Sequence, residues 1–204
     1  ARFAPNEESR KAVRSAWGVA DDDIVVGTIA RLFKNKGYEE IMAAMPLALE
    51  RAPKLRFLWV GDGANRGRYE RDLQRANLRD RVIMVGLVPP AEVARLLTGF
   101  DILVHASRWE GLSRAVVQAL LTEVPAISFD NDGAPEVVLP ERTGLLAPLG
   151  NVQALSDAIV RLAGQATLRR KLGRNGRRHC LVEFDVNRMV DQIDSLYRDL
   201  LLRQ

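Results

Sequence analysis

The sequence contains very little cysteine and histidine, and this excludes several kinds of site. Its 204 residues include one cysteine, Cys180, so an internal disulfide and a cysteine-rich zinc site are both excluded. A reducing, cytosolic setting is the simplest inference from such sparse cysteine. The two histidines, His105 and His179, belong to no cluster with metal-ligand spacing. We therefore expect no metal ion at the functional site.

Long apolar runs, internal repeats and low-complexity tracts are also missing. The longest apolar segments are far too short to span a bilayer, and no signal peptide is visible. The first residue is Ala1 rather than Met, from which we expect a piece of a longer protein. The length predicts a single domain over residues 1–204, of which residues 151–204 are mainly helical.

The charge balance is basic, with a net charge of +4 and far more Arg than Lys. A basic domain can bind nucleic acid, an anionic membrane or a phosphorylated small molecule. The cations are scattered through the predicted helices, so a solvated basic surface is the main interpretation and weak attraction to a membrane surface is the alternative. No motif supports a nucleic-acid role.

Short β-branched segments alternate with segments of helical periodicity. Strands are predicted at residues 24–30, 55–60, 82–85, 101–105, 125–129 and 143–147. Helices are predicted at residues 6–18, 37–52, 66–76, 90–97, 112–121, 133–138, 152–163, 166–183 and 186–202. This alternation predicts an α/β fold with a parallel sheet of about six strands, helices on both faces and a C-terminal helical tail.

The loop after the first predicted strand carries two cations beside the start of a helix. Arg31 lies at the strand end, and Lys36 and Gly37 lie at the helix start. Ligands of parallel sheets bind beyond the carboxyl ends of the strands. A guanidinium fork and a point charge at that place predict a diphosphate clamp, with ordinary surface charges beside a turn as the alternative.

The loop after the fourth predicted strand contains Glu110 and Gly111, which are predicted to open a helix. Bare N–H groups and the helix dipole make such a junction a seat for phosphate. A carboxylate there can also accept hydrogen bonds from sugar hydroxyls. Ser113 lacks the second glycine of a hydrolase nucleophile elbow, so a serine hydrolase is not predicted.

Two other loops offer weaker signals. Gly61 and Gly63 belong to a glycine-rich segment whose spacing does not match a dinucleotide fingerprint, although these glycines would let a nucleotide approach the backbone. Leu87 and Val88 could form an apolar wall for a planar base, or could simply turn the chain into the next helix.

Three further side chains are predicted to have structural roles. His105 ends a buried strand and is expected to pack in the core or against a loop rather than act as a base. Trp109 is expected to pack over the edge of the sheet. His179 is expected at the surface of a basic helix.

The order of these motifs is more specific than any one of them. The motifs are Gly27…Arg31…Lys36-Gly37, Val60-Gly61-Asp62-Gly63, Val85-Gly86, Ser107-Arg108-Trp109-Glu110-Gly111, Gly133-Ala134-Pro135-Glu136 and Thr143-Gly144-Leu145-Leu146. Their order resembles the C-terminal, donor-binding domain of the group 1 (family 4) retaining glycosyltransferases. Those enzymes have the GT-B architecture of two Rossmann-like domains, so the resemblance implies a Rossmann-like sheet.

The resemblance also implies roles for particular residues. Arg31 and Lys36 would hold the diphosphate of a nucleotide-sugar donor, and Glu110 would face the hydroxyls of the donor sugar. The backbone amides of Gly111, Leu112 and Ser113 would lie near the sugar and the phosphate. Further donor-binding candidates are Gly27, Gly61, Gly63, Leu87 and Val88.

Gln118 departs from the family pattern. Glu110 matches the first glutamate of the family's E-x7-E motif, whereas the second glutamate, which usually grips the ribose hydroxyls, is Gln118 here. A neutral amide forms weaker hydrogen bonds than a carboxylate, so a loss of roughly 1–2 kcal/mol of donor affinity is expected.

The resemblance implies sugar transfer with retention of configuration, without a metal or other cofactor. An N-terminal acceptor-binding domain would be the partner of this chain, and the chain alone would be inactive. The final helix would cross back toward that domain, which makes self-association a hypothesis here. A GT-B epimerase or phosphorylase and a non-catalytic binding module are the alternatives. The location implied is cytoplasmic, with a peripheral position at the inner face of the membrane as an option.

Overall fold

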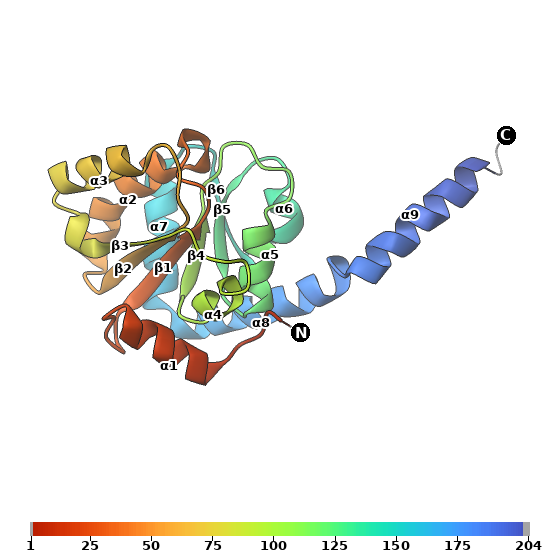
Figure 1. Ribbon diagram of the computed structural model, residues 1–204, viewed down its shortest axis with the longest axis horizontal. Helices are drawn as coiled ribbons and strands as arrows, with labels where there is room; N and C mark the ends of the chain where they lie inside the picture. The colour runs from red at the N-terminus through yellow and green to blue at the C-terminus, as the bar shows by residue number, and fades with distance from the viewer. Residues whose placement is uncertain (1, 202–204) are drawn as a thin grey trace.

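A computed structural model describes residues 2–201 and contains a six-stranded sheet in the order β3-β2-β1-β4-β5-β6 (Figure 1). All neighbouring strands are parallel. The strands are β1 (Ile24–Ile29), β2 (Leu55–Val60), β3 (Val82–Gly86), β4 (Ile102–His105), β5 (Ala126–Asp130) and β6 (Gly144–Pro148). The predicted α/β class is confirmed.

Helices follow most of the strands and end the chain. They are α1 (Glu7–Ala16), η1 (Lys34–Lys36), α2 (Tyr38–Arg51), α3 (Arg66–Arg75), η2 (Arg79–Arg81), α4 (Val93–Leu97), α5 (Arg114–Leu121), α6 (Ala134–Val137), α7 (Val152–Gly164), α8 (Ala166–Glu183) and α9 (Val186–Leu201). The predicted end of the last helix, Leu202, lies outside the described residues.

Two helix starts differ from the sequence prediction by more than one residue. Helix α4 begins at Val93 rather than at Pro90, which lies in the preceding turn. Helix α5 begins at Arg114 because Ser113 has an extended backbone (φ −76°, ψ 106°). The residues from Glu110 to Ser113 therefore form a loop rather than the first turn of a helix.

Helices cover both faces of the sheet, and each face has its own hydrophobic core. On one face α2, α3 and α7 pack on alternate strand residues such as Phe57, Trp59 and Val104. On the other face α1, α4 and α5 pack on the intervening residues, such as Leu58 and Leu103. Because successive strand side chains point to opposite faces, the apolar strands fill both cores at once.

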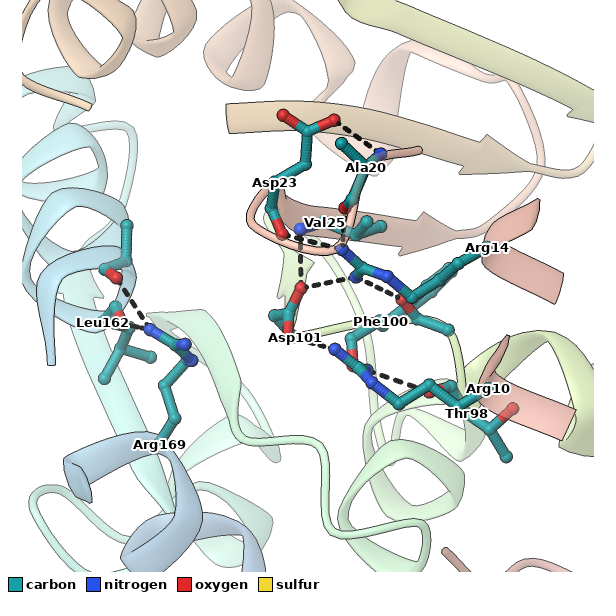
Figure 2. A network of polar contacts seen from close by, with 12 residues as sticks. Arg10, Arg14, Ala20, Asp23, Val25, Thr98, Phe100, Asp101, Leu162 and Arg169 are labelled. Carbon is teal, nitrogen blue, oxygen red and sulfur yellow. Dashed lines mark hydrogen bonds and ion pairs between the residues drawn. The ribbon is translucent and has the colours of Figure 1, made fainter. Parts of the chain in front are cut away.

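A buried ion network fixes α1 to the amino ends of β1 and β4 (Figure 2). The carboxylate of Asp101 accepts hydrogen bonds from Arg10 (2.7 Å), Arg14 (3.0 Å) and the backbone N–H of Val25 (2.8 Å). Arg14 also donates to the carbonyl oxygens of Ala20 and Asp23 in the turn before β1. The cations of α1 therefore satisfy the backbone where β1 begins.

Helix α9 projects away from the rest of the molecule, whereas α8 lies along its lower edge in Figure 1. The large apolar side chains of α9 are exposed; they are Val186, Met189, Val190, Ile193, Leu196, Tyr197, Leu200 and Leu201. None of the helices within residues 2–201 has the length and apolar character needed to cross a membrane.

Candidate functional site

The sheet order reverses between β1 and β4, which places the loops after these two strands side by side. Strand β1 pairs with β2 on one side and with β4 on the other. In open parallel sheets, the crevice at the carboxyl ends of two such strands is where ligands bind. The loops that carry Lys36 and Glu110 meet at this place.

A close backbone approach holds the β1 loop against the end of β4. Gly37 has a φ of 75°, and a Cβ atom there would lie 1.9 Å from the carbonyl oxygen of Ala106. Only glycine fits both the left-handed backbone and this contact. The carbonyl oxygen of Asn35 then accepts hydrogen bonds from the hydroxyl of Ser107 and the backbone N–H of Arg108. Lys36 is thereby fixed next to the β4 loop.

The loop containing Glu110 is held from its other side by the loop after β5. The backbone N–H of Glu110 donates to Asp132 Oδ2 at 2.9 Å, and the side chain of Asn131 donates to the carbonyl oxygen of Arg108. A Cβ atom on Gly133 would lie 1.9 Å from the carbonyl oxygen of Gly111, so the two loops touch through their backbones. These contacts explain why α5 starts late.

Three charged or titratable side chains converge at this crevice. Lys36 Nζ donates to Glu110 Oε2 at 2.5 Å, and the two side chains are 13% and 30% exposed. His105 Nε2 lies 3.4 Å from the same oxygen, without a hydrogen bond among the described residues, and His105 is 7% exposed. The neighbouring His105 and Lys36 side chains lower the pKa of Glu110 from 4.5 to about 2, against the opposing effect of burial. Glu110 is therefore a carboxylate at neutral pH.

The burial of His105 confirms the sequence prediction, but its approach to Glu110 was not anticipated. The signal was present in the sequence, because His105 is the last residue of a buried strand only five positions before Glu110. A polar side chain at the carboxyl end of a parallel strand can face either the ligand crevice or the core, so position alone did not decide between the two.

An open cavity of about 340 Å³ lies beside the ion pair. Its polar lining comes from Lys36, His105, Glu110, Ser113, Arg114 and Gln118, and its apolar lining from Ile29, Ala30, Val88, Pro90, Val93 and Ala115. The lining is divided equally between polar and apolar residues, and convergent polar groups beside apolar side chains are typical of a small-molecule site. The predicted residues Lys36, Glu110, Ser113, Gln118 and Val88 are thus brought together.

Other predicted residues lie outside this lining. Arg31 is exposed, and its guanidinium carbon is stacked 4.7 Å from the centre of the Phe33 ring. Leu87 is 83% exposed, so of the predicted apolar wall only Val88 faces the cavity. Gly111 lines a smaller recess behind Glu110, and Leu112 is exposed.

The glycines of the predicted site have different environments. Gly27 is buried in the middle of β1, where a Cβ atom would lie 2.0 Å from the Phe100 ring, so it packs in the core and does not line the cavity. Gly61 and Gly63 lie at the carboxyl edge of the sheet, against the backbones of Ala30 and Leu32. They let the loops after β1 and β2 cross closely and do not line the cavity.

The expectation for Trp109 is wrong. Trp109 is 71% exposed and does not pack over the sheet edge, because the loop that carries it turns toward the residues after β5. Across residues 2–201, no three His, Cys, Asp or Glu side chains gather in a group that could hold a metal ion.

Comparisons with known proteins agree with this architecture. The family model described as glycosyl transferases group 1 matches residues 9–179. A GDP-mannose-dependent monoacylated alpha-(1-6)-phosphatidylinositol monomannoside mannosyltransferase of Corynebacterium glutamicum is 29% identical, with 96% of this chain and 52% of that protein covered. The chain spans about half the length of the curated relatives it matches.

Solved structures of similar proteins also match this chain over only about half of their own length. A sucrose-phosphate synthase from Thermosynechococcus elongatus is 30% identical, with a TM-score of 0.87 over 100% of this chain and 51% of that one. The HepE protein of Anabaena, solved in complex with UDP-glucose, is 24% identical, with a TM-score of 0.87 over 97% of this chain and 54% of that one. On the strength of the family match and the shared fold, the chain belongs to the group 1 glycosyltransferases and has the Rossmann-like fold of one half of a GT-B enzyme.

Proposed function

We propose that this chain binds the nucleotide-sugar donor of a retaining glycosyltransferase whose acceptor-binding domain is a separate N-terminal part of the whole protein. The observation that carries the proposal is the pair of Lys36 and Glu110 at the edge of the 340 Å³ cavity, at the point where the sheet order reverses. The structure of HepE with UDP-glucose and the half-length match to curated relatives support the donor class and the separate domain.

The geometry suits a ligand that has both a negatively charged diphosphate and sugar hydroxyls. In the free chain, Glu110 and Lys36 satisfy each other. A diphosphate would attract Lys36, and sugar hydroxyls would then donate to the carboxylate that Lys36 leaves. Because Glu110 is ionised at neutral pH, it can accept these hydrogen bonds at full strength. Lys36 and Glu110, which bind each other in the free chain, would thus each contact a different group of the ligand.

The chemical contribution of the site would be stabilisation of the departing diphosphate. As the bond between the sugar and the phosphate oxygen breaks, negative charge grows on the diphosphate, and cations held in place beforehand lower the barrier. Lys36 is already at the cavity. Arg31 is exposed near the start of the same loop, so its guanidinium would leave the Phe33 ring to complete the clamp. No metal ion is required in this scheme.

Gln118 lies in the cavity wall on α5, one helical turn after the loop that contains Glu110. Its amide can accept one hydrogen bond and donate another, which suits a ribose hydroxyl pair but lacks the strength of a carboxylate. We propose that Gln118 contacts the ribose, with a donor affinity roughly 1–2 kcal/mol weaker than a glutamate would give.

A panel of nucleoside diphosphates and nucleotide sugars, tested by thermal shift and calorimetry, examines the proposal. The preferred donor should stabilise the chain, and the stabilisation should be lost in Arg31→Ala. Arg75→Ala is the matched control, because Arg75 is an exposed cation on α3, away from the cavity. Binding that is unchanged in Arg31→Ala would contradict the clamp.

The alternatives give other outcomes. A chain that no UDP, GDP or ADP compound stabilises would be a non-catalytic module of the same fold. The family match does not favour an epimerase or phosphorylase, and isotope exchange without an acceptor in the whole protein would separate these from a transferase. We expect little or no transfer by this chain alone, since the acceptor would bind to the other domain.

We also propose a cytoplasmic location for the whole protein, at the inner face of the membrane. The sparse cysteine and the basic surface support this location.

A further inference from the structure

Helix α8 has a concentration of positive charge that no other helix of the chain shares. Between residues 169 and 178 it carries six cations and no acid, and the only acidic residue of the helix is its last, Glu183. The six cations are Arg169, Arg170, Lys171, Arg174, Arg177 and Arg178. Sequence alone suggested scattered charge, but the helix gathers these residues along one element.

Two of the six cations serve the fold. Arg169 donates to the carbonyl oxygens of Leu162 and Ala163 at the end of α7 (Figure 2). Arg177 donates to the carbonyl oxygens of Phe3 and Leu121, which ties the N-terminal segment to α5. The packing of α8 therefore explains these two cations, whereas Arg178 donates, among the described residues, only within the helix, to Asn175 Oδ1 at 2.8 Å.

The other four cations share one exposed face. Arg170, Lys171, Arg174 and Arg178 are all exposed, whereas Leu172, Gly173, Gly176 and Cys180 are buried against the body of the protein. On a helix of 3.6 residues per turn, the four cations occupy an arc of roughly 100°. We refer to these four residues as the basic face of α8.

The cations of the basic face form no ion pair within the described part of the chain, although the charge of Lys171 contributes, after Arg161, to lowering the pKa of Glu141. None of the ion pairs among residues 2–201 includes any of the four cations, although exposed arginines elsewhere, such as Arg51, Arg68 and Arg161, are paired with acids. Four like charges on one face repel one another, so the unpartnered state costs stability and is best relieved by an external anion.

The end of the same face is apolar. Leu181 and Val182 follow Arg178, are exposed, and lie within about the same 120° of the helix as the four cations. Cations beside exposed aliphatic side chains on one convex helix face are typical of an interfacial helix on an anionic bilayer. A nucleic acid would favour a row of stacking aromatic side chains, and none of the residues on the basic face is aromatic.

From these observations we propose that the basic face of α8 docks on the anionic lipid headgroups of a membrane surface, with Leu181 and Val182 entering the boundary between headgroups and acyl chains. This proposal gives the proposed location a specific surface. It does not depend on nucleotide binding, because α8 lies away from the cavity at the carboxyl edge of the sheet.

The test is co-sedimentation of the chain with phosphatidylcholine vesicles that contain or lack phosphatidylglycerol, in the absence of nucleotide. Binding should require phosphatidylglycerol and should disappear at about 1 M salt, where the Debye length is about 3 Å. Each Lys or Arg near an anionic surface is worth roughly 1 kcal/mol, about five-fold in binding, so Lys171→Gln with Arg174→Gln should weaken binding about 30-fold.

The matched control removes two exposed cations elsewhere. Arg75→Gln with Arg95→Gln changes the net charge equally but leaves the basic face intact, and both double variants should unfold like the parent chain because all four side chains are exposed. Three results would overturn the proposal: equal loss of binding in the two double variants, equal binding to vesicles with and without phosphatidylglycerol, or binding of RNA or an acidic polypeptide without binding of anionic vesicles. The vesicle experiment and the nucleotide-binding experiment are independent. Failure to bind vesicles would not contradict donor binding, and failure to bind nucleotides would not contradict membrane docking.

Discussion

Replacement of Glu110 by glutamine should destabilise the free chain in a pH-dependent way. In the folded chain the pKa of Glu110 is about 2, against 4.5 for an unperturbed carboxyl, because of His105 and Lys36. Each unit by which folding lowers a pKa corresponds to about 1.4 kcal/mol of stability. The stabilisation of the fold by ionised Glu110 therefore has an upper limit of roughly 3 kcal/mol. Glu110 is 30% exposed, and solvent screening reduces this to about 1–2 kcal/mol.

The sign of the pH dependence follows from the lowered pKa. The ionised carboxylate stabilises the fold fully above pH 4.5, and this contribution is lost as the pH falls from about 4.5 to about 2. Denaturant unfolding of the parent chain and Glu110→Gln should therefore differ by about 1–2 kcal/mol at pH 7, and the difference should shrink steadily below pH 4.5.

The control for this experiment is Glu92→Gln, which removes an exposed ion pair with Arg95 on α4. Its effect should stay within about 0.5 kcal/mol at every pH. The reasoning would be refuted if Glu110→Gln were as stable as the parent chain at pH 7, or if the difference between them were the same at pH 3 as at pH 7.

Three other perturbations have expected outcomes. Asp101→Asn should lower the free energy of unfolding by about 3 kcal/mol in a denaturant titration, because it removes the charge that balances two arginines, whereas Asp194→Asn on exposed α9 should change it little; equal effects would contradict the assigned network. Gly37→Ala should destabilise the chain by more than about 2 kcal/mol, because a positive φ and a carbonyl oxygen 1.9 Å away both oppose a Cβ atom, whereas Gly164→Ala meets open space; a tolerated Gly37→Ala would show that the loop can move. Burial raises the pKa of Cys180 to about 12, so a thiol reagent at pH 8 should modify it only after unfolding; rapid modification of the folded chain would show that α8 opens.

The fold followed from the sequence because its signals were local. Short β-branched strands at regular intervals, separated by helical periodicity, left only a parallel sheet with helices on both faces. Helix starts were less predictable, because they depend on contacts from other loops. The backbone at Glu110 could have been helical, but the side chain of Asp132, 22 residues further along the chain, accepts its N–H.

The site was predictable in outline and not in detail. Ligands bind at the carboxyl ends of parallel strands, and this rule predicted that Lys36 and Glu110 lie at the same edge of the sheet although 74 residues separate them. The same rule could not show that Arg31 would stack on Phe33, or that His105 would reach Glu110. Nor could it show that the Phe100 ring would occupy the space beside Gly27.

The position of the Lys36–Glu110 pair across the reversal of the sheet also bears on how the chain folds. Lys36 follows β1, which pairs with β2, whereas Glu110 follows β4, which pairs with β5. Parallel strands distant in sequence pair slowly, because loop-closure entropy must be overcome first. The two side chains can meet only after β1 and β4 have paired, so their contact reports the joining of the two halves of the sheet. A ligand that needs both halves would bind only the assembled chain and would draw partly folded molecules toward it.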